Sequence, residues 1–524
     1  MKNGHFSDKT KISTILERVF NSTAIKGSVV NPRTIPPQLS REDRINRIVA
    51  VAIVMTGVTM SAIDTTAVVL GLPVMKTDLH SDLISMVWVI MAYLLITTIA
   101  TTQVGRLGDM FGRVRMYNLG FALFTVFSLF CGFSQSGTEL IVFRIFQGLG
   151  GAFIFANSGA ILADTFPPQE RGKAFGYNGI GWSLGAILGI LVGGAFVTFF
   201  SWRYIFFINV PIGIVATLVG YLMLKEKSPR VREQLDYGGL VLLGAGLFAV
   251  LYGVSNITGS GWTDTYGLEM LIGFLLIVSF VLLERRVKHP LLDLSIFRSR
   301  ILTASIFAAF FQSLATFAVL FLVIMYLQGP RGFTPWSSSI LLIPGYILGG
   351  VVAPLSGRLS DRYGARVLAT IGLSVQIVGI LVYLTFGLTT SIFVVVLGAV
   401  IYGSGNSAFF APNNSAVMAS APPKAYGVTN GLLRTMANVG MLSSFAVALL
   451  IASISIPREY AFQIFVGVGK ISGDLSLAYI TGMHTALVAS IALLLIAIAL
   501  SILRGKESRD PPGTVRDALV SKTN

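Results

Sequence analysis

The stretch Gly105-Arg-Leu-Gly-Asp109-Met-Phe-Gly112-Arg-Val-Arg115 returns later in the chain as Gly357-Arg-Leu-Ser-Asp361-Arg-Tyr-Gly364-Ala-Arg366. Gly, Arg, Leu, Asp and Gly recur in it at a constant offset of 252 residues. A second set of anchors recurs at an offset of 255: Phe155-Ala156 and Pro167-Pro168 return as Phe410-Ala411 and Pro422-Pro423. The chain therefore contains an internal repeat.

The repeated stretch has the composition of a tight loop between two helices. Its glycines permit the positive φ angles that a short turn requires. Its aspartate can cap a neighbouring helix and pair with an arginine. Two copies at equivalent places argue against an ordinary basic loop.

Outside these loops the chain is strongly apolar. Of its 524 residues 54% are hydrophobic and 12% are charged, and the mean hydropathy is +0.76. A soluble chain carries about 25% charged residues. Three long stretches have no charge at all: Ala174–Trp202, Ile301–Pro330 and Val367–Pro423. Since about 20 apolar residues span a bilayer as a helix, we predict an all-α polytopic membrane protein. This excludes a soluble enzyme, a nucleic-acid binder and a secreted disulfide scaffold.

Hydropathy and breaker residues predict fourteen membrane helices. They are 48–70, 83–103, 115–133, 138–163, 172–198, 204–224, 238–257, 265–284, 301–327, 337–357, 366–386, 391–415, 427–454 and 482–503. With the N-terminus inside, 32 Lys and Arg fall in cytoplasmic segments and 5 in external loops. Because cytoplasmic loops collect positive charge, we expect both tails in the cytoplasm. The same preference explains the net charge of +15 without nucleic acid.

The repeat divides the chain into two halves of six helices each. We expect a tail at 1–47, a six-helix bundle at 48–224 and a second bundle at 301–503, followed by a tail at 504–524. The two helices within 225–300, with their basic linkers, have no counterpart in the repeat. They are therefore an insertion between the two bundles.

Six-plus-six helices with this loop after the second helix of each half resemble the major facilitator superfamily. The two extra central helices resemble its 14-helix drug:proton antiporters of the EmrB/QacA type. Further stretches fit that group: Ile63-Asp64-Thr65-Thr66 running to Leu72-Pro73, Trp202 through Gly213, and Pro290-Leu-Leu-Asp293. Two positions depart from it. Ile190 stands where the antiporter motif of the fifth helix has proline, and Val69 stands where the first helix commonly has asparagine.

The resemblance implies a secondary active transporter of the plasma or inner membrane that exports amphipathic small molecules in exchange for protons. It implies alternating access, a monomer in the lipid bilayer, and cytoplasmic gates at the repeated loops. The gate residues would be Gly105, Asp109, Gly112 and Arg113 in the first copy and Gly357, Asp361, Gly364 and Arg366 in the second. A permease that imports a specific metabolite is the nearest alternative. A channel and a membrane-embedded enzyme are the alternatives from other classes.

One charged pair is expected deep in the membrane. Asp64 and Arg144 each lie about six residues from the external end of their helix, hence at nearly the same depth. An ionisable group within a span usually marks a pathway or relay. We therefore predict Asp64 and Arg144 as a proton-coupling pair, with a fixed ion pair that merely locks two helices as the alternative. Arg434, seven residues into its helix, is expected to extend toward the cytoplasmic surface.

Glycines form a stripe on the fifth helix. Gly181, Gly185, Gly189 and Gly193 are four residues apart and so share one face. Such stripes let helix backbones approach closely in lipid. The resemblance implies that the tenth helix, which carries Gly345 and Gly349 at the same spacing, lies against the fifth. We therefore expect the stripe to face the tenth helix and to serve either static packing or a pivot.

Polar side chains of the second half are candidates for lining a substrate cavity, with interhelical hydrogen bonds as the alternative. They are Gln312, Thr316, Asn406 and Asn413. The four histidines are scattered and Cys131 is the one cysteine, so we expect no metal site. No Walker loop occurs, so ATP hydrolysis is not expected. The expected partners are a small-molecule substrate, protons and lipid, without a cofactor or nucleic acid.

Overall fold

The computed structural model describes residues 41–167, 170–226, 234–287, 290, 294–420, 426–465 and 473–505. Fourteen helices in these ranges are long and apolar enough to cross a membrane, which is the predicted number. The predicted tails, apart from residues 41–47 and 504–505, and parts of the basic linkers between 225 and 300 lie outside the described residues.

The helices fall into three sets in chain order. The first set is α2 (Arg41–Asp78), α3 (Leu83–Phe111), α4 (Arg113–Phe133), α5 (Gly137–Thr165), α6 (Arg171–Phe199), α7 (Tyr204–Phe207) and α8 (Asn209–Met223). The second is α9 (Tyr237–Ser260) and α10 (Asp264–Glu284), followed by the 3-10 helix η2 (Leu294–Arg298). The third is α11 (Arg300–Gln328), α12 (Pro335–Tyr363), α13 (Ala365–Tyr383), α14 (Ile392–Ser420), α15 (Tyr426–Ile454), α16 (Arg458–Phe465) and α17 (Asp474–Leu503).

Several helices differ from their predicted bounds: α3 continues to Phe111 instead of residue 103, α12 continues to Tyr363 instead of residue 357, and α17 begins at Asp474 instead of residue 482. We expected the first helix to end at residue 70, but α2 continues through Pro73 to Asp78, because neighbouring helices tolerate a proline inside a membrane span. The sixth span is divided at Ile208 into α7 and α8. Pro211 has no N–H to donate to the carbonyl of Phe207, four residues earlier. The short helix α16 was not predicted.

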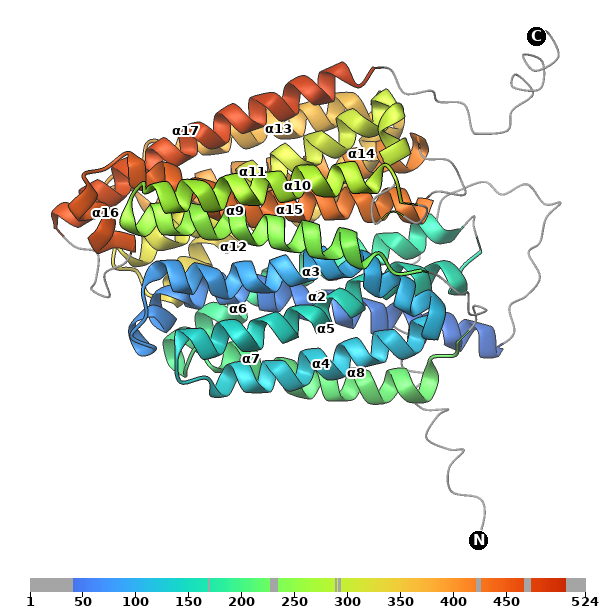
Figure 1. Cartoon of the computed structure of the whole chain (residues 1–524). Coiled ribbons are helices and arrows are strands. Elements are labelled where there is room, and N and C mark those ends of the chain that lie inside the picture. Colours follow the sequence, from blue (N-terminus) through green and yellow to red (C-terminus); the bar gives the residue numbers. More distant parts are fainter. Residues whose placement is uncertain are drawn as a thin grey trace.

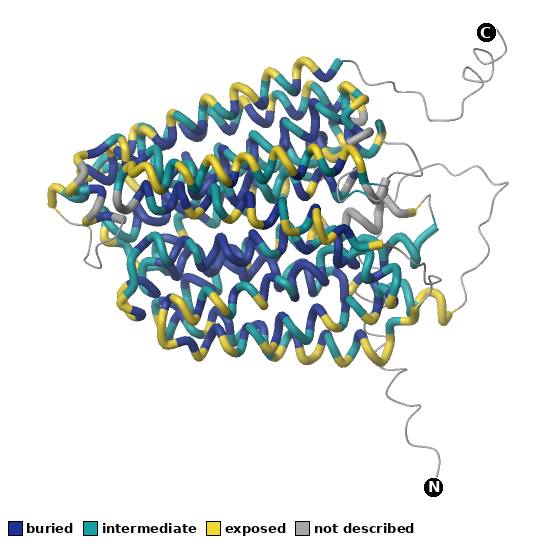
Figure 2. Tube along the Cα trace, viewed as in Figure 1, coloured by how far each residue is buried: buried dark blue, intermediate teal, exposed yellow. Residues whose placement is uncertain are grey.

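The first and third sets form two groups of roughly parallel helices that lie side by side (Figure 1). The first group, α2 to α8, packs around α2, and the second, α11 to α17, packs around α11 and α14. The groups meet along α6 with α12 and along α3 with α15. The pair α9 and α10 lies on one side, with α9 in contact with both α3 and α15. Exposed residues concentrate on the outward faces of the helices (Figure 2).

The repeated loops are tight turns centred on a glycine. Gly112 joins α3 to α4 with φ +113°, and Gly364 joins α12 to α13 with φ +92°. Side chains rarely adopt such angles, so both turns require glycine. We call the side of the molecule that carries these two turns the Gly112 end, and the opposite side, where α2 joins α3, the Asp82 end.

Candidate functional site

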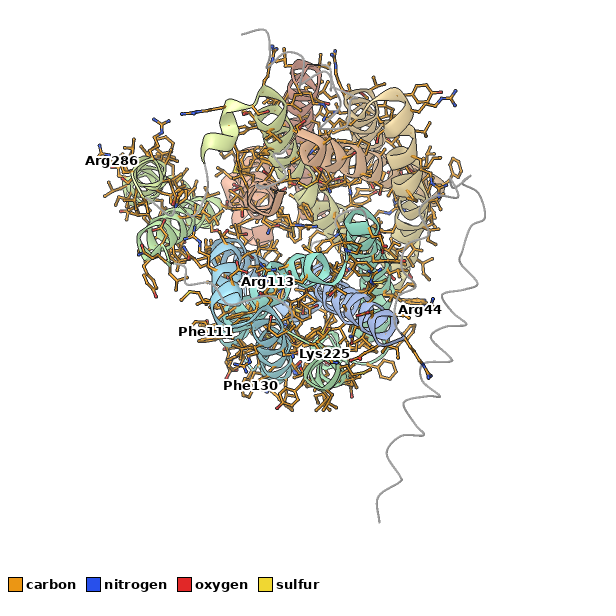
Figure 3. The ribbon with its side chains drawn as sticks, turned by 90° about the vertical axis from the view of Figure 1, so that its right-hand side faces the viewer. Arg44, Phe111, Arg113, Phe130, Lys225 and Arg286 are labelled. Carbon is orange, nitrogen blue, oxygen red and sulfur yellow. The ribbon has the colours of Figure 1, made fainter. Side chains whose placement is uncertain are left out.

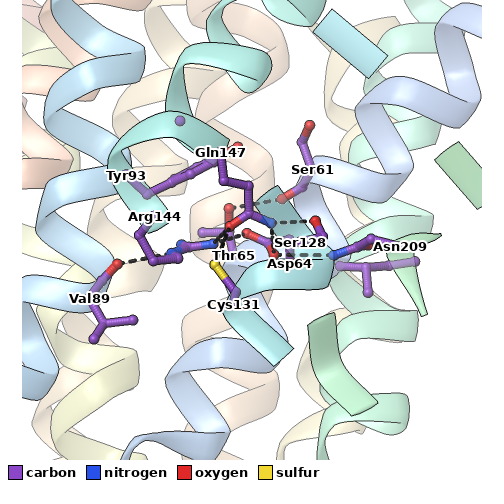
Figure 4. Close-up of polar contacts among 12 residues, drawn as sticks. Ser61, Asp64, Thr65, Val89, Tyr93, Ser128, Cys131, Arg144, Gln147 and Asn209 are labelled. Carbon is purple, nitrogen blue, oxygen red and sulfur yellow. Dashed lines mark hydrogen bonds and ion pairs between the residues drawn. The ribbon is translucent and has the colours of Figure 1, made fainter. Parts of the chain in front are cut away.

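Asp64 and Arg144 form an ion pair inside the first group of helices (Figure 4). Arg144 Nη1 on α5 lies 2.5 Å from Asp64 Oδ2 on α2. The side chain of Asp64 is 0% exposed and that of Arg144 is 1% exposed. The equal depths expected from the sequence therefore bring the two charges together.

The carboxylate of Asp64 also accepts two neutral hydrogen bonds. Gln147 Nε2 donates to Asp64 Oδ1 at 3.0 Å, and Asn209 Nδ2 donates to the same oxygen at 3.3 Å. Gln147 Nε2 further donates to Ser128 Oγ at 2.7 Å. Asp64 is thus held by side chains from α5 and α8 together, which ties three helices of one group to one carboxylate.

Arg144 is equally well satisfied. It donates to the Val89 carbonyl at 3.0 Å and to Gln147 Oε1 at 2.7 Å. Its guanidinium carbon lies 4.3 Å from the centre of the Tyr93 ring, which adds a cation–π contact. Removing one partner of such a buried pair typically costs about 3–5 kcal/mol. The pair therefore fixes α2, α3 and α5 relative to one another in this conformation.

The two side chains that donate neutral hydrogen bonds to Asp64 were not among the predicted site residues. Gln147 lies three residues after Arg144 on the same helix, a spacing that places both on one face. Asn209 belongs to the stretch from Trp202 to Gly213 noted above for its resemblance. The same stretch supplies Trp202 and Arg203, which donate to Asp78 at 2.7 Å and 2.6 Å.

A second polar cluster lies in the other group of helices. Gln312 Nε2 donates to Asn406 Oδ1 at 2.7 Å and to Thr316 Oγ1 at 3.1 Å. Gln376 Nε2, which was not predicted, donates to Thr316 Oγ1 at 2.7 Å. Gln312 is fully buried, whereas Asn406 is partly exposed. These side chains bond mainly to one another, and Asn406 is the member that reaches open space.

Asn413 lies apart from that cluster. It is 1% exposed, donates to the Ser305 carbonyl at 3.2 Å, and accepts from Arg504 at 3.4 Å. It therefore ties α14 to α11 and to the end of α17. Asn413 lies seven residues, or two helical turns, beyond Asn406 on α14, and its contacts are the interhelical hydrogen bonds expected as the alternative to lining a cavity.

The first repeated loop contains a network of ion pairs. Arg113 Nη2 lies 2.7 Å from Asp109, and Arg113 Nη1 lies 2.7 Å from Asp164 on α5. Glu226 accepts from the backbone N–H groups of Arg113 and Val114. The loop is thereby attached to the ends of α5 and α8. A Cβ on Gly105 would lie 3.8 Å from Ala156 Cβ, an ordinary contact.

In the second copy, Gly357 has the matching neighbour: its Cβ would lie 3.7 Å from Ala411. Arg366 is partly exposed at the start of α13. The side chain of Asp361 lies outside the described residues.

The glycine stripe of α6 packs against α2. A Cβ on Gly185 would lie 2.5 Å from the Thr59 carbonyl, and one on Gly193 would lie 2.8 Å from Ala67 Cα. Gly181 faces Met55 and Gly189 faces Ile63 and Thr66 in the same way. The expectation that the stripe faces α12 was wrong. Gly345 and Gly349 of α12 instead face α14, so both stripes pack within a group.

Two close contacts between α6 and α12 lie at the Asp82 end. A Cβ on Gly194 would lie 2.3 Å from Ser339 Oγ, and Thr198 Oγ1 accepts from the Trp336 N–H at 2.9 Å. Toward the Gly112 end, Gly179 of α6 and Gly350 of α12 would each have no atom within 4 Å of an added Cβ. Gly350 lies eleven residues after Ser339, hence on the same face. The two helices therefore separate toward the Gly112 end.

A hydrogen bond between α2 and α11 also places the contact between the groups at the Asp82 end. Gln328 of α11 donates to the Leu70 carbonyl of α2 at 3.1 Å, again near the Asp82 end. The conformation is thus closed between the groups at the Asp82 end and open along α6 and α12 at the Gly112 end.

Comparison with known proteins relates this architecture to transporters. Riboflavin transporter RibZ of Clostridioides difficile is 31% identical over 393 residues, which cover 75% of this chain and 85% of that protein. The tetracenomycin C resistance and export protein of Streptomyces glaucescens is 31% identical over 405 residues, covering 76% and 75%. Multidrug resistance protein Stp of Mycobacterium tuberculosis is 30% identical over 413 residues, covering 77% and 76%.

Solved structures share the fold at low identity. A bacterial homologue of the human lysosomal transporter Spinster, in an inward-facing and unoccupied conformation, has a TM-score of 0.64 and 18% identity, covering 89% of this chain and 97% of that one. The inward-open xylose transporter XylE of E. coli has a TM-score of 0.56 and 14% identity, covering 84% and 94%. The family model described as Major Facilitator Superfamily matches residues 54–445. The chain therefore belongs to the major facilitator superfamily of membrane transporters.

Proposed function

We propose that this transporter uses a proton gradient to export amphipathic small molecules from the cytoplasm. The observation that carries the proposal is the enclosed Asp64–Arg144 pair. It is an ion pair placed in the membrane-spanning core, and such groups mark relays in transporters. A carboxylate can accept a proton, and protonation removes the charge that holds Arg144. Proton uptake would therefore loosen α2 from α5.

In this proposal the two groups of helices are the two units of alternating access, with boundaries at residues 48–224 and 301–503. The Gly112 end is the cytoplasmic end, because the sequence places 32 Lys and Arg on that side and 5 on the other. Both tails would then be cytoplasmic in a plasma or inner membrane. The opening between α6 and α12 would load substrate from the cytoplasm. The protein would act as a monomer in lipid, without a cofactor or nucleic acid.

The gate role of the repeated loops belongs to the same proposal. Arg113 joins Asp109 to Asp164, and so joins the loop to α5. Closing the Gly112 end would require this network to rearrange, since it lies on the side that opens.

Two named relatives support export, namely the tetracenomycin and multidrug resistance proteins. Another named relative, the riboflavin transporter, favours a second candidate, a permease for one metabolite. Ile190 in place of the antiporter proline also favours that second candidate.

Reconstitution into liposomes with an imposed pH gradient of either sign tests the proposal. The assay would follow a panel of cationic, neutral and anionic compounds. We expect uphill substrate movement opposite to the proton flow and its collapse with a protonophore. Movement in the same direction as protons would support the permease, and uphill flux insensitive to the gradient would exclude proton coupling.

A further inference from the structure

Arg434 lies on the inward face of α15. Residues that continue its face toward the Asp82 end are buried: Met441, Phe445, Ala448 and Ala452 are between 2% and 6% exposed. The opposite face carries Met436, Val439, Val447, Leu450 and Ile454, which are apolar and partly or fully exposed. That second face is the one suited to lipid. Arg434 therefore points into the protein and away from lipid. The expectation from the sequence was that it extends along the helix toward the cytoplasmic surface.

Arg434 is nevertheless exposed. A residue on the buried face of a membrane helix can be exposed only where the protein interior is open. Gly431, one turn earlier, would have no atom within 4 Å of an added Cβ. The repeat offset of 255 relates Arg434 to Gly179 of α6, which also faces open space. We infer that Gly179, Gly350, Gly431 and Arg434 face one opening between the two groups, and we name it the Gly112 cleft.

Nothing acidic balances Arg434 there. Among the described residues, no carboxylate lies within ion-pair distance of it. From residue 294 to residue 458 the sequence has one acidic residue, Asp361 of the second loop. Asp64 of the other group is 0% exposed and already bonded to Arg144. Ionisable groups within spans face a water-filled cavity or pair with another charge, so Arg434 is available to an anionic group that enters the cleft.

We propose that Arg434 binds the anionic group of the transported molecule, and hence that the substrates are amphipathic organic anions. This inference rests on the proposed function only in that the Gly112 cleft is the substrate path. Such substrates carry the opposite charge to those that a cleft lined with carboxylates would select. Arginine suits the role because its planar fork matches carboxylate, sulfonate and phosphate groups.

The second polar cluster gives the substrate a second contact. A Cβ on Gly440 would lie 2.4 Å from the Phe310 carbonyl and 3.1 Å from the Leu314 nitrogen, so Gly440 is level with Gln312 of α11. Arg434 lies six residues, about 9 Å, nearer the Gly112 end. Asn406 is hydrogen-bonded to Gln312 and is partly exposed, so it is the accessible polar group at the level of Gln312. A matching ligand carries its anionic group about 9 Å from a hydrogen-bonding group.

The first test measures the charge of the cleft without any substrate. Cys131 is the one cysteine and is fully buried, so Asn438→Cys, one turn from Arg434, provides a single reactive thiol. We compare its labelling by sulfonatoethyl and trimethylammonioethyl methanethiosulfonate, one anionic and one cationic. Arg434→Gln should lower the anionic-to-cationic rate ratio about 3- to 7-fold, as expected for a unit charge one turn away.

Two variants serve as controls in the same background. Arg434→Lys keeps the charge and should keep the ratio. Arg286→Gln removes an exposed arginine at the edge of the α9–α10 pair, away from the cleft (Figure 3), and should not change it. An unchanged ratio in Arg434→Gln, or a thiol at 438 that neither reagent labels, overturns the proposal.

The second test measures binding to purified protein with fluorescein and rhodamine 6G, which share a xanthene ring and differ in charge. The wild type should bind the anion more tightly. Arg434→Gln should weaken fluorescein binding about tenfold, which is ~1.4 kcal/mol, and leave rhodamine 6G unaffected. Preference for the cation, equal binding of both, or no binding of either by the wild type contradicts the proposal. Neither test needs a proton gradient, so failure of proton coupling would leave both results intact.

Discussion

Thr316 stands in the second repeat where Asp64 stands in the first, 252 residues earlier. The offset of 255 likewise relates Gln147 to Tyr402. In both groups these two positions are hydrogen-bonded: Gln147 Nε2 donates to Asp64 Oδ1 at 3.0 Å, and the Tyr402 hydroxyl donates to the Thr316 carbonyl at 2.8 Å. The repeat thus retains a polar centre in each half but a charge in only one. Any proton chemistry at this position belongs to the first half.

Asp64→Asn tests that assignment. The amide keeps the shape but cannot be ionised, so we expect normal membrane yield, loss of uphill transport driven by a pH gradient, and retained substrate exchange at equal pH. Yield and flux are measured in the same samples. Full uphill flux in the variant would remove Asp64 from the mechanism.

If the pair is only a lock between α2 and α5, the same variant should behave differently. It strands a buried arginine, which costs about 3–5 kcal/mol, so yield and thermal stability should fall. Asp64→Asn combined with Arg144→Gln should then restore both folding and coupled transport. Restored folding without coupling supports the proton role instead.

Asp109→Asn should slow the transport cycle without lowering membrane yield. Asp109 and Arg113 are both partly exposed, and pairs of this kind contribute about 0.2–1 kcal/mol. We therefore expect turnover to fall about 1.5- to 5-fold. Asp264→Asn, an exposed carboxylate at the start of α10, is the matched control. Wild-type turnover in Asp109→Asn would end the gate assignment.

Gly189→Leu should be far more damaging than Gly179→Leu. A Cβ at Gly189 would lie 2.0 Å from Thr66 Oγ1 and 2.8 Å from the Ile63 carbonyl, whereas Gly179 faces open space. Forcing extra volume into such a contact typically costs about 1–3 kcal/mol or more. Thermal unfolding of the two variants in detergent measures the difference, and equal losses would refute the packing argument.

Gln328→Ala should shift the molecule away from the conformation described. Its hydrogen bond to the Leu70 carbonyl holds α11 to α2 near the Asp82 end, and a typical bond of this kind contributes about 0.5–1.5 kcal/mol. The open state at the Gly112 end should become less populated. Alkylation of Gly179→Cys reports this, because that position faces open space in the conformation whose Gly112 end is open. Unchanged alkylation would show that this bond does not favour one state.

Hydropathy and charge predicted the number of membrane helices because lipid imposes their length and composition. The depth of Asp64 and Arg144 predicted their meeting for the same reason. Contacts set by helix rotation were harder to predict. The four-residue spacing of the stripe through Gly189 indicates close packing of helix backbones. The spacing does not say which helix the stripe packs against, and in the structure that helix is α2. Gln376 had no charge or spacing to distinguish it from other polar residues in spans.

Glu284 illustrates the same limit. A carboxylate at the end of a helix is ordinarily solvated, yet its side chain is 3% exposed, because Gly239 of α9 lies over it: a Cβ there would be 2.6 Å from Glu284 Oε1. Glu284 is buried because α9 and α10 pack against each other as an antiparallel pair, an arrangement that the sequence around Glu284 does not reveal.

The α9–α10 pair also makes the two flanks of the transporter unequal. On one flank α6 faces α12 directly, while on the other α9 contacts both α3 and α15. A hydrophobic molecule dissolved in the bilayer could therefore reach the boundary between α6 and α12 directly. The boundary between α3 and α15 is shielded from lipid by α9. Twelve helices alone would leave both flanks alike. The added pair makes lateral entry from the membrane one-sided.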